Sequence, residues 1–532
     1  QIPRPSINNL RDQLARAMSR EGAISSTLLP PSTMGNTSSA QLDVMRASDL
    51  RLSQRRVAIV TTAALPWMTG TSINPLLRAA SLTTKGFEVS LVLPWLETKQ
   101  QPKLFPEGVT FADENEQEQW IREWLRRAAV ADDVALKRLQ VRWYPALYEE
   151  FLGAVIQRSR VDIIQAIPPD ERDVAILEEP EHINWYHSGV QWTDSFAHVV
   201  GVLHTNYLYY AKYEEREGGA GDIPPEVREQ IMSTMNNLVC SAHIDVAIKL
   251  SPTLPDVPGH CVVCNVHGVR GSFLAIGERM AAVGTDPEAR AAAFDKGAYF
   301  LGKALWTKGY RAFVDELTVA RAAGVTVPTL VTFGSGRDEA EIRAEVDTAS
   351  LPMIMHPAID HANPQLHSYR LFVNPSTSEV LCTATAEALA MGKKVLIPKH
   401  PSNSFFEQFS NTIVYEDQRQ LFDLVRDALE TPPLPMSPKE QYLLSWEAAT
   451  ERLLDAALLP TSEARRGQPL HMLAYAVHAG IGLPLLDDYF RANSGGTPRY
   501  THWEDRLAAL LRGTYETDDY DDDEVSRLHD LK

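Results

Sequence analysis

Two lysines stand where an apolar, strand-like run gives way to a helical pattern. Lys303 and Lys308 are five positions apart and follow the run 298–301 directly. In an open α/β sheet, ligands bind beyond the carboxyl ends of the strands. Two ammonium groups there could hold a diphosphate and stabilise its charge when it departs as a leaving group. The alternative is a pair of solvated surface lysines, which the spacing alone would favour.

Two glutamates, Glu379 and Glu387, are eight positions apart. Glu387 falls inside a predicted helix, and Glu379 precedes the loop that opens it. The backbone amides of Leu381, Cys382 and Thr383 would then lie at the helix N-terminus, where they can bind an anion. Carboxylates beside such an anion suit vicinal hydroxyls, because a charged acceptor binds a diol strongly. The alternative is an acid that interacts with the helix dipole, plus an ordinary helical glutamate.

A histidine and a group of acids follow two further predicted strands. His204 ends the run 199–203 and would face a cleft, where it could hydrogen-bond a sugar hydroxyl or assist proton movement. A structural histidine is an equal alternative. The segment after the run 174–177 combines carboxylates with aromatic rings, which suits carbohydrate, although solvated loop acids would look the same. Its candidate residues are Glu178, Glu179, Glu181, His182 and Trp185.

Several motifs that would indicate other chemistry are missing from the sequence. It has no Walker-type phosphate loop, no GxSxG nucleophile elbow and no GxGxxG in its first half. A DxD metal motif occurs only at Asp521–Asp523, inside an acidic tail that is predicted to be a solvated terminus. A P-loop nucleotidase, an α/β-hydrolase, a dinucleotide-binding enzyme and a catalytic metal site are therefore unsupported.

The elements that must position these residues are short apolar runs alternating with helical patterns. The alternation begins at the run 57–60, starts again near residue 262 and ends in a helical stretch over 436–459. Such alternation indicates βαβ units, so we predict two doubly wound α/β domains in series with a ligand cleft between them. The other predicted strands are 89–93, 161–165, 174–177, 198–203, 246–250, 298–301, 329–333, 371–374, 395–397 and 412–415, and the other helices are 74–80, 120–128, 383–391 and one after Gly309.

Length and composition exclude several classes of protein. The chain of 532 residues suffices for about two to four domains. Its 44% hydrophobic and 23% charged residues are ordinary for a globular protein and exclude a disordered chain or a collagen. The net charge of −18 argues against a nucleic-acid partner. The four cysteines form neither a disulfide framework nor a zinc pattern, so we predict reduced thiols in an intracellular chain.

Any membrane attachment is predicted to be peripheral. No window approaches ~18 uninterrupted apolar residues, which a spanning helix requires. A basic amphipathic helix around Ile7–Met18 is one candidate contact, with a leader or a packed helix as its alternative. The helical face that carries Trp120 and Trp124 is the other, and burial in the core is its alternative.

Seven motifs stand out between about residues 55 and 455. They are Ile59–Thr71 (IVTTAALPWMTGT), Ile176–His182 (ILEEPEH), His204–Tyr207 (HTNY), Cys264–Val269 (CNVHGV), Lys296–Lys303 (KGAYFLGK), Leu381–Lys393 (LCTATAEALAMGK) and Leu444–Thr450 (LSWEAAT). Together they resemble the motifs of plant and algal digalactosyldiacylglycerol synthases, which are retaining GT-B glycosyltransferases of family four.

The resemblance implies a GT-B fold, in which two Rossmann-like domains face a central cleft. It implies retaining transfer of galactose from UDP-galactose to the 6-hydroxyl of the galactose in monogalactosyldiacylglycerol. No cofactor and no metal would be needed, because lysines would stabilise the departing UDP. The place implied for the protein is the outer envelope membrane of the chloroplast, as a peripheral protein. The chain would consist of five parts: a leader or linker over 1–54, an acceptor domain over 55–268, a donor domain over 269–435, a helical return to the first domain over 436–459 and an accessory extension over 460–532.

The resemblance also implies roles for single residues. Lys303 and Lys308 would bind the diphosphate, Glu379 would lie near the hydroxyls of the transferred sugar, and Glu387 would bind the ribose. Plant members tend to carry Asp where this chain has Glu379, so the sugar contacts could differ. The implied donor-binding residues are Gly70, Thr71, Lys303, Lys308, Gly334, Glu379, Leu381, Cys382, Thr383 and Glu387, and the implied catalytic residues are His204, Lys303, Lys308 and Glu379.

Two other functions stay open. One is a family-four transferase that acts on a different lipid or on a soluble glycoside. The other is a non-catalytic protein that binds nucleotide sugars or tethers lipids. The joint presence of both lysines, both glutamates and the histidine argues against the non-catalytic alternative.

Overall fold

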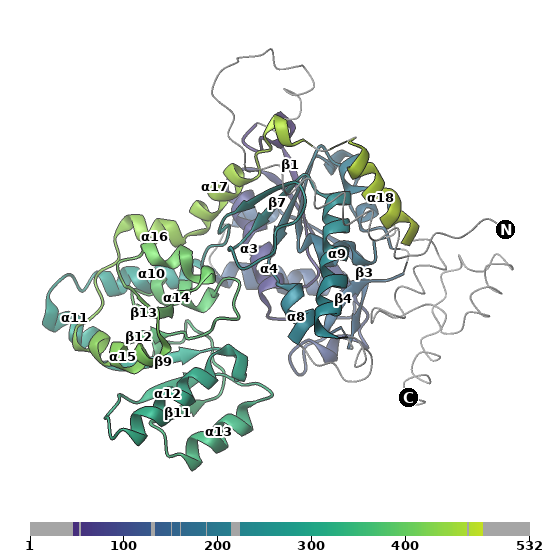
Figure 1. Cartoon of the computed structure of the whole chain (residues 1–532). Helices are drawn as coiled ribbons and strands as arrows, with labels where there is room; N and C mark the ends of the chain where they lie inside the picture. The colour runs from purple at the N-terminus through teal and green to yellow at the C-terminus, as the bar shows by residue number, and fades with distance from the viewer. Residues whose placement is uncertain are drawn as a thin grey trace, which may run out of the picture.

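The chain forms two α/β domains side by side (Figure 1). The computed structural model describes residues 46–52, 55–128, 133–150, 152–159, 161–187, 189–213, 224–464, 466 and 468–481. The predicted helix around Ile7–Met18, most of the predicted leader and the acidic tail lie outside these residues.

The first domain is built on an eight-stranded sheet with the order β4-β3-β2-β1-β5-β6-β7-β8. All neighbouring strands run parallel except β3 and β4, which are antiparallel. The central strands are buried on both faces, which explains their continuous apolar sequences. The strands are β1 (Arg56–Val60), β2 (Glu88–Leu96), β3 (Gln140–Glu149), β4 (Ala154–Gln157), β5 (Val174–Glu178), β6 (His198–Leu203), β7 (Val246–Lys249) and β8 (His260–Val263).

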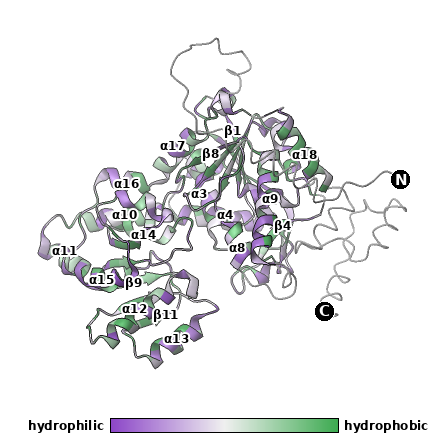
Figure 2. Ribbon diagram, viewed as in Figure 1, coloured by the Kyte–Doolittle hydropathy of each residue, from purple (hydrophilic) through white to green (hydrophobic). Residues whose placement is uncertain are grey.

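Helices contribute apolar side chains to the core around this sheet. The hydropathy colouring shows hydrophobic and hydrophilic residues interspersed along the helices (Figure 2). The helix α4 buries Ile121 and Leu125, while Trp120 and Trp124 are half-buried and pack against the same core. The helices of the first domain are α3 (Gly70–Thr84), α4 (Glu114–Ala128), α5 (Asp133–Arg138), α6 (Pro180–Trp185), α7 (Trp192–Ser195), α8 (Tyr207–Tyr213) and α9 (Pro225–His243).

The second domain has a six-stranded, all-parallel sheet with the order β11-β10-β9-β12-β13-β14. Its strands are β9 (Lys296–Leu301), β10 (Leu330–Phe333), β11 (Met353–His356), β12 (Tyr369–Val373), β13 (Lys394–Pro398) and β14 (Thr412–Tyr415). Its helices are α10 (Gly271–Ala281), α11 (Pro287–Ala293), α12 (Tyr310–Ala322), α13 (Glu339–Thr348), α14 (Thr383–Ala390), α15 (Leu421–Glu430) and α16 (Pro438–Leu444).

The chain then crosses back to the first domain. The helix α17 (Trp446–Ala456) packs on α3, and Trp446, Ala449 and Leu453 join the core of the first domain. The outward and return crossings touch, because the Val269 amide donates to the Leu444 carbonyl at 2.9 Å. A Cβ on Gly268 would lie 2.6 Å from the Trp446 nitrogen, so only glycine fits there. The last helix of the described residues, α18 (Pro469–Ile481), packs on α9.

The predicted fold class, two doubly wound α/β domains of the GT-B type, is confirmed. The predicted strand at 161–165 is wrong: Ile163–Ala166 form a 3-10 turn, because the Asp162 side chain accepts a hydrogen bond from the Ile164 amide. The new alternation predicted near residue 262 is also misplaced, since β8 pairs with β7 in the first sheet. The strands β3, β4 and β11 were not predicted.

None of the helices in the described part of the chain has the length and apolar character that a bilayer-crossing segment requires. All four cysteines are free thiols, as predicted.

Candidate functional site

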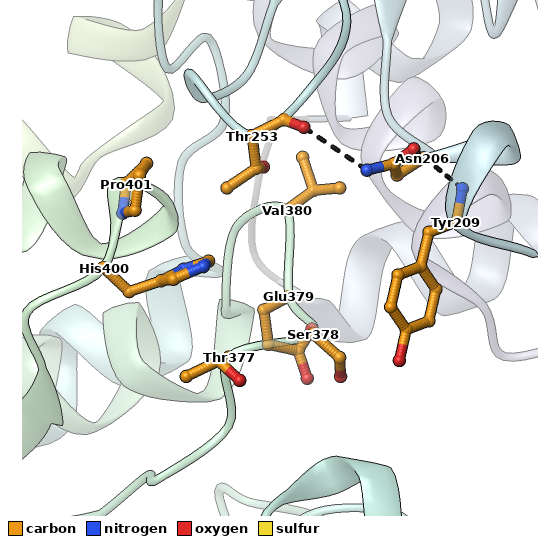
Figure 3. A pocket seen from close by; sticks show the side chains of 9 residues that line it. All are labelled: Asn206, Tyr209, Thr253, Thr377, Ser378, Glu379, Val380, His400 and Pro401. Carbon is orange, nitrogen blue, oxygen red and sulfur yellow. Dashed lines mark hydrogen bonds between the residues drawn. The ribbon is translucent and has the colours of Figure 1, made fainter. Parts of the chain in front are cut away.

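A cavity of about 320 Å³ lies between the two domains (Figure 3). The first domain contributes residues that follow β6 and β7, and the second contributes the loops that follow β12 and β13. Both sheets therefore present the carboxyl ends of their strands to it, which is where open α/β sheets bind ligands. The lining residues are Asn206, Tyr209, Thr253, Thr377, Ser378, Glu379, Val380, His400 and Pro401.

The predicted residues Lys308 and Glu379 meet at this cavity. Lys308 Nζ donates to Glu379 Oε1 at 2.8 Å, and each side chain is about one quarter exposed. Burial lowers the pKa of Lys308, but the Glu379 carboxylate outweighs it and holds the pKa above its usual value of 10.5. Lys308 is therefore a firmly charged ammonium group bound to Glu379, which lines the cavity.

The turn that carries both lysines is fastened to the loop that carries Glu379. Gly309, directly after Lys308, has φ 103°, and a Cβ there would lie 2.6 Å from Pro375. Ser378 Oγ donates to the Thr307 carbonyl at 3.0 Å. Lys303 lies earlier in the same connection and is exposed. The contacts between the two loops therefore keep the Lys308 ammonium group next to the Glu379 carboxylate.

Gly334 and Gly70 have backbone roles in the structure. A Cβ on Gly334 would lie 1.8 Å from the Gly302 carbonyl oxygen, so this glycine lets β10 approach the connection after β9. Gly70 and Thr71 begin α3, which starts four residues before the helix predicted over 74–80. Thr71 also accepts a hydrogen bond at its carbonyl from Thr61 Oγ1, at 2.6 Å.

The predicted anion site lies at the start of α14. Cys382 is the N-cap residue, and Thr383 begins the helix. Burial, followed by the nearby Glu379 charge, raises the pKa of the Cys382 thiol to about 12, so the thiol stays neutral. Glu387 lies one turn further along α14, where its Oε2 is 2.8 Å from His361 Nδ1.

His204 is bound to Glu178 at the end of β5, and Glu178 is bound in turn to Arg78 of α3. The His204 Nε2 atom contacts Glu178 Oε2, and Arg78 Nε donates to Glu178 Oε1 at 2.5 Å. Burial would raise the pKa of Glu178, but Arg78 and His204 lower it to about 2. Arg78 and Glu178 are both fully buried, so this chain of charges fixes the ring of His204 from inside the domain.

Sequence reasoning missed Arg78. Its only signal was one arginine in an apolar helix, in the stretch Leu76-Leu77-Arg78-Ala79-Ala80. Arg78 also donates to the Val266 carbonyl at 2.9 Å, in the segment that leaves the first domain.

The acidic segment predicted to face a sugar is buried. Glu178, Glu179, Glu181 and His182 are at most 5% exposed, and Trp185 is 9% exposed. Both alternatives considered from the sequence assumed an accessible loop, and that assumption is wrong, because Pro180 starts the helix α6 directly after β5. Their role in binding an acceptor stays a prediction.

Two of these buried groups, Glu179 and Trp185, are held by hydrogen bonds to neighbouring side chains, whereas Glu181 Oε2 and His182 Nε2 have no hydrogen-bond partner among the described residues. Glu179, in a left-handed conformation with φ 67°, accepts from Thr62 Oγ1 at 3.1 Å and from the Thr205 hydroxyl. Trp185 donates from its indole to Asn236 at 2.9 Å. Burial raises the pKa of Glu181 to about 8, so this acid is neutral at pH 7.

One group of described residues has the spacing of a metal site. The ligand atoms of Glu178, His204 and His267 lie within 4.8 Å of one another. The guanidinium of Arg78 already compensates the Glu178 charge from 2.5 Å, which opposes a second cation. This donor set therefore fits a hydrogen-bonded histidine better than a bound metal ion.

Sequence comparison finds similar proteins in several plants. The family Glycosyl transferases group 1 matches residues 295–431. Digalactosyldiacylglycerol synthase 1, chloroplastic, of Glycine max is 44% identical over 405 residues, which are 76% of this chain and 49% of that protein. Digalactosyldiacylglycerol synthase 2, chloroplastic, of Lotus japonicus is 40% identical over 408 residues, 76% of this chain and 84% of that protein. The chain spans about half the length of the synthase 1 relatives that it matches.

Among solved structures, Anabaena HepE in complex with UDP covers 80% of this chain and 100% of its own, at 12% identity and a TM-score of 0.42. The sucrose-phosphate synthase of Thermosynechococcus elongatus has the same coverage, at 11% identity and a TM-score of 0.43. Scores this low decide nothing about function. The identity to the Lotus japonicus synthase 2, over most of that protein, does decide the family: the chain belongs to the digalactosyldiacylglycerol synthases.

Proposed function

We propose that this protein is a retaining galactosyltransferase. It moves galactose from UDP-galactose to the 6-hydroxyl of the galactose in monogalactosyldiacylglycerol and so forms digalactosyldiacylglycerol. Membership of the synthase family supports this choice of substrates. The observation that carries the proposal is the cavity between the domains, where Lys308 and Glu379 meet below residues of the first domain.

The donor would bind to the second domain. Lys303 and Lys308 would hold the diphosphate, with the amides at the start of α14 as further donors. Glu379 would contact the hydroxyls of the transferred galactose, and Glu387 the ribose. Lys303 is exposed and the Lys308 side chain is one quarter exposed, so both ammonium groups are accessible to a ligand.

The acceptor would enter from the first domain. In a front-face substitution, the bond from galactose to the UDP oxygen breaks while the acceptor 6-oxygen attacks from the same side. The departing phosphate oxygen accepts the hydroxyl proton, and the two lysines stabilise the charge that develops on UDP. His204, held by Glu178, would hydrogen-bond a sugar hydroxyl. No cofactor and no metal is needed for this scheme.

The lipid acceptor requires access to a membrane surface. We therefore place the protein as a peripheral protein on the chloroplast outer envelope, in keeping with the chloroplastic names of the relatives. No nucleic-acid partner is proposed.

Turnover of UDP-galactose with vesicles that contain monogalactosyldiacylglycerol tests the proposal. Vesicles without this lipid, and UDP-glucose in place of UDP-galactose, are the controls. NMR of the product should show a new α linkage to the 6-position. A β linkage would reject the retaining mechanism, transfer only to another acceptor would support the alternative transferase, and UDP-galactose binding without turnover would support a non-catalytic binder.

A further inference from the structure

We propose that His361 is a positioning residue that fixes the carboxylate of Glu387 for the ribose hydroxyls of the donor. The inference rests on the function proposed above, because it concerns the acid assigned to the ribose. His361 belongs to the connection between β11 and β12, and none of the roles already discussed involves it.

The hydrogen bonds of His361 fix both nitrogens of its ring. Tyr299 Oη lies 2.7 Å from His361 Nε2, and His361 Nδ1 lies 2.8 Å from Glu387 Oε2. A carboxylate can only accept, so Nδ1 must carry the proton that it donates to Glu387. In the neutral imidazole, Nε2 is then the acceptor for the Tyr299 hydroxyl. Burial raises the pKa of Tyr299 well above its usual value, so the phenol keeps its proton.

Burial makes this geometry rigid. The side chain of His361 is 3% exposed and that of Glu387 is 21% exposed, so the chain of hydrogen bonds runs from the core to a partly exposed carboxylate. The rings of Phe273 and Phe372 lie 5.8 Å and 5.7 Å from the His361 ring and hold it in place. Within the described residues, no other side chain makes a hydrogen bond to the Glu387 carboxylate, which leaves Oε1 for a ligand.

The backbone before His361 is fastened as well. Asp360 accepts from the Ala362 amide at 2.8 Å and from Arg270 at 3.1 Å, which ties the connection to the start of α10. A carboxylate that is already oriented loses less freedom when it binds a diol than one that rotates freely. His361 thereby raises the affinity for the ribose without touching the nucleotide.

The alternative is that His361 only fills the core. The two roles differ in which ligand they affect. A positioning role acts through the ribose hydroxyls, whereas a packing role would disturb the whole domain and weaken every nucleotide alike.

The test compares His361→Asn with His361→Leu, two side chains of similar size. The Asn amide nitrogen can stand where Nδ1 stands and donate to Glu387, whereas Leu cannot. Calorimetry should show that His361→Leu weakens UDP about tenfold or more, that His361→Asn restores most of the affinity, and that 2′,3′-dideoxy-UDP binds all three proteins equally. Equal weakening of both nucleotides by His361→Leu would overturn the proposal, as would unchanged UDP affinity.

Two further variants complete the design. Glu387→Gln distinguishes failure of the proposed function from failure of the positioning role. If it leaves UDP binding unchanged, the ribose assignment of the proposed function fails. If it weakens UDP while His361→Leu does not, only the positioning role fails.

Tyr299→Phe covers the case in which His361→Leu does not fold. Without the phenol, the His361 ring can take the other tautomer, so UDP should weaken severalfold and the dideoxy analogue should not; unchanged UDP affinity would overturn the proposal.

Discussion

Lys308 Nζ and Glu379 Oε1 are hydrogen-bonded at 2.8 Å, so the cation assigned to the diphosphate and the acid assigned to the sugar bind each other. Their charges compensate in the cleft, where both side chains are largely shielded from water. A donor that carries a diphosphate and a sugar offers each of them a new partner. Binding would therefore exchange one ion pair for two contacts with the same ligand.

Lys308→Met should lower turnover by about two to three orders of magnitude, because loss of one donor to a developing oxyanion costs about 3 kcal/mol. Lys303→Met should act in the same direction, and Lys439→Met, at an exposed position outside the cleft, should not. Initial rates with UDP-galactose and lipid vesicles measure the effect. Near-normal rates for both cleft variants would remove the diphosphate role.

Chelation should leave turnover largely intact, because lysines take the place of a divalent cation in the proposed scheme. The measurement is the rate before and after treatment with EDTA, with added Mg²⁺ or Mn²⁺ as the control. Complete loss of activity that only added metal restores would contradict metal-independent catalysis and would direct attention to Glu178, His204 and His267.

The two glutamates of the donor site should separate in a binding experiment. Glu387→Gln should weaken UDP itself, because this acid is assigned to the ribose. Glu379→Gln should spare UDP affinity and lower the turnover of UDP-galactose, because its assigned contacts are to the sugar. Calorimetry with UDP and initial rates with UDP-galactose, measured on both variants, distinguish the two roles. An equal loss of UDP affinity in both variants would contradict separate roles for Glu379 and Glu387.

Arg78→Met should destabilise the first domain by about 3–5 kcal/mol, because it leaves the buried Glu178 carboxylate without its main partner. Arg138→Met is the matched control, since Arg138 donates to the Thr83 carbonyl of the same helix from an exposed position. Denaturant unfolding gives the free energies. The double variant Arg78→Met with Glu178→Leu should recover part of the loss, and a loss as large as that of Arg78→Met alone would contradict the buried-charge explanation.

The same experiment has a pH dependence with a defined sign. In the wild type the pKa of Glu178 is lowered to about 2 from 4.5, so its contribution to stability is present above pH 4.5 and disappears as pH falls toward 2. In Arg78→Met, burial should raise that pKa instead, and the variant should become more stable as pH falls from 7 toward 5. Unfolding free energies at several pH values check the reversal.

The attachment of α18 should weaken in mild acid. His243 Nε2 lies 2.9 Å from His478 Nδ1, and burial lowers the pKa of His478 to about 4 from 6.5. The unfolded helix therefore binds a proton below pH 6.5 that the packed helix excludes, so stability is complete above pH 6.5 and is lost as pH falls toward 4. The pKa of His243 is lowered as well, first by burial and then by the charges of His478, His187 and His471.

Hydrogen exchange of α18 at pH 7.5 and pH 5.5 measures this change. Protection of Pro469–Ile481 should fall at the lower pH, while that of the central strand β5 should not. His478→Gln should reduce the pH dependence. Equal protection of α18 at both pH values would contradict the prediction.

The sequence reveals elements whose signal is local. Strands such as β5 and β6 are buried on both faces, so their apolar runs stand out and their bounds were predicted to within a residue. The strand β3 mixes exposed, half-buried and buried residues and contains Pro145, so it lacks the continuous apolar run that marks a buried strand. The run 161–165 also contains apolar residues, but the Asp162 side chain accepts a hydrogen bond from the Ile164 amide and stabilises a 3-10 turn in place of a strand.

The site shows the same limit. Lys308, Glu379 and His204 could be proposed from their places at strand ends, but the partner of each was out of reach, because Lys308 and Glu379 are 71 positions apart. Arg78 is 100 positions from Glu178. Side-chain pairs so far apart in the sequence depend on how the sheets fold, and no local sequence pattern predicts them.

The return of α17 to the first domain has a consequence for synthesis on the ribosome. The core of this domain includes Trp446 and Leu453, which are translated only after every strand of the second sheet. The second domain has all of its strands once Tyr415 has emerged, while the nascent first domain still lacks part of its interior. Of the two domains, the first is therefore the later to complete its core, and until α17 is made the face of α3 that receives it stays uncovered.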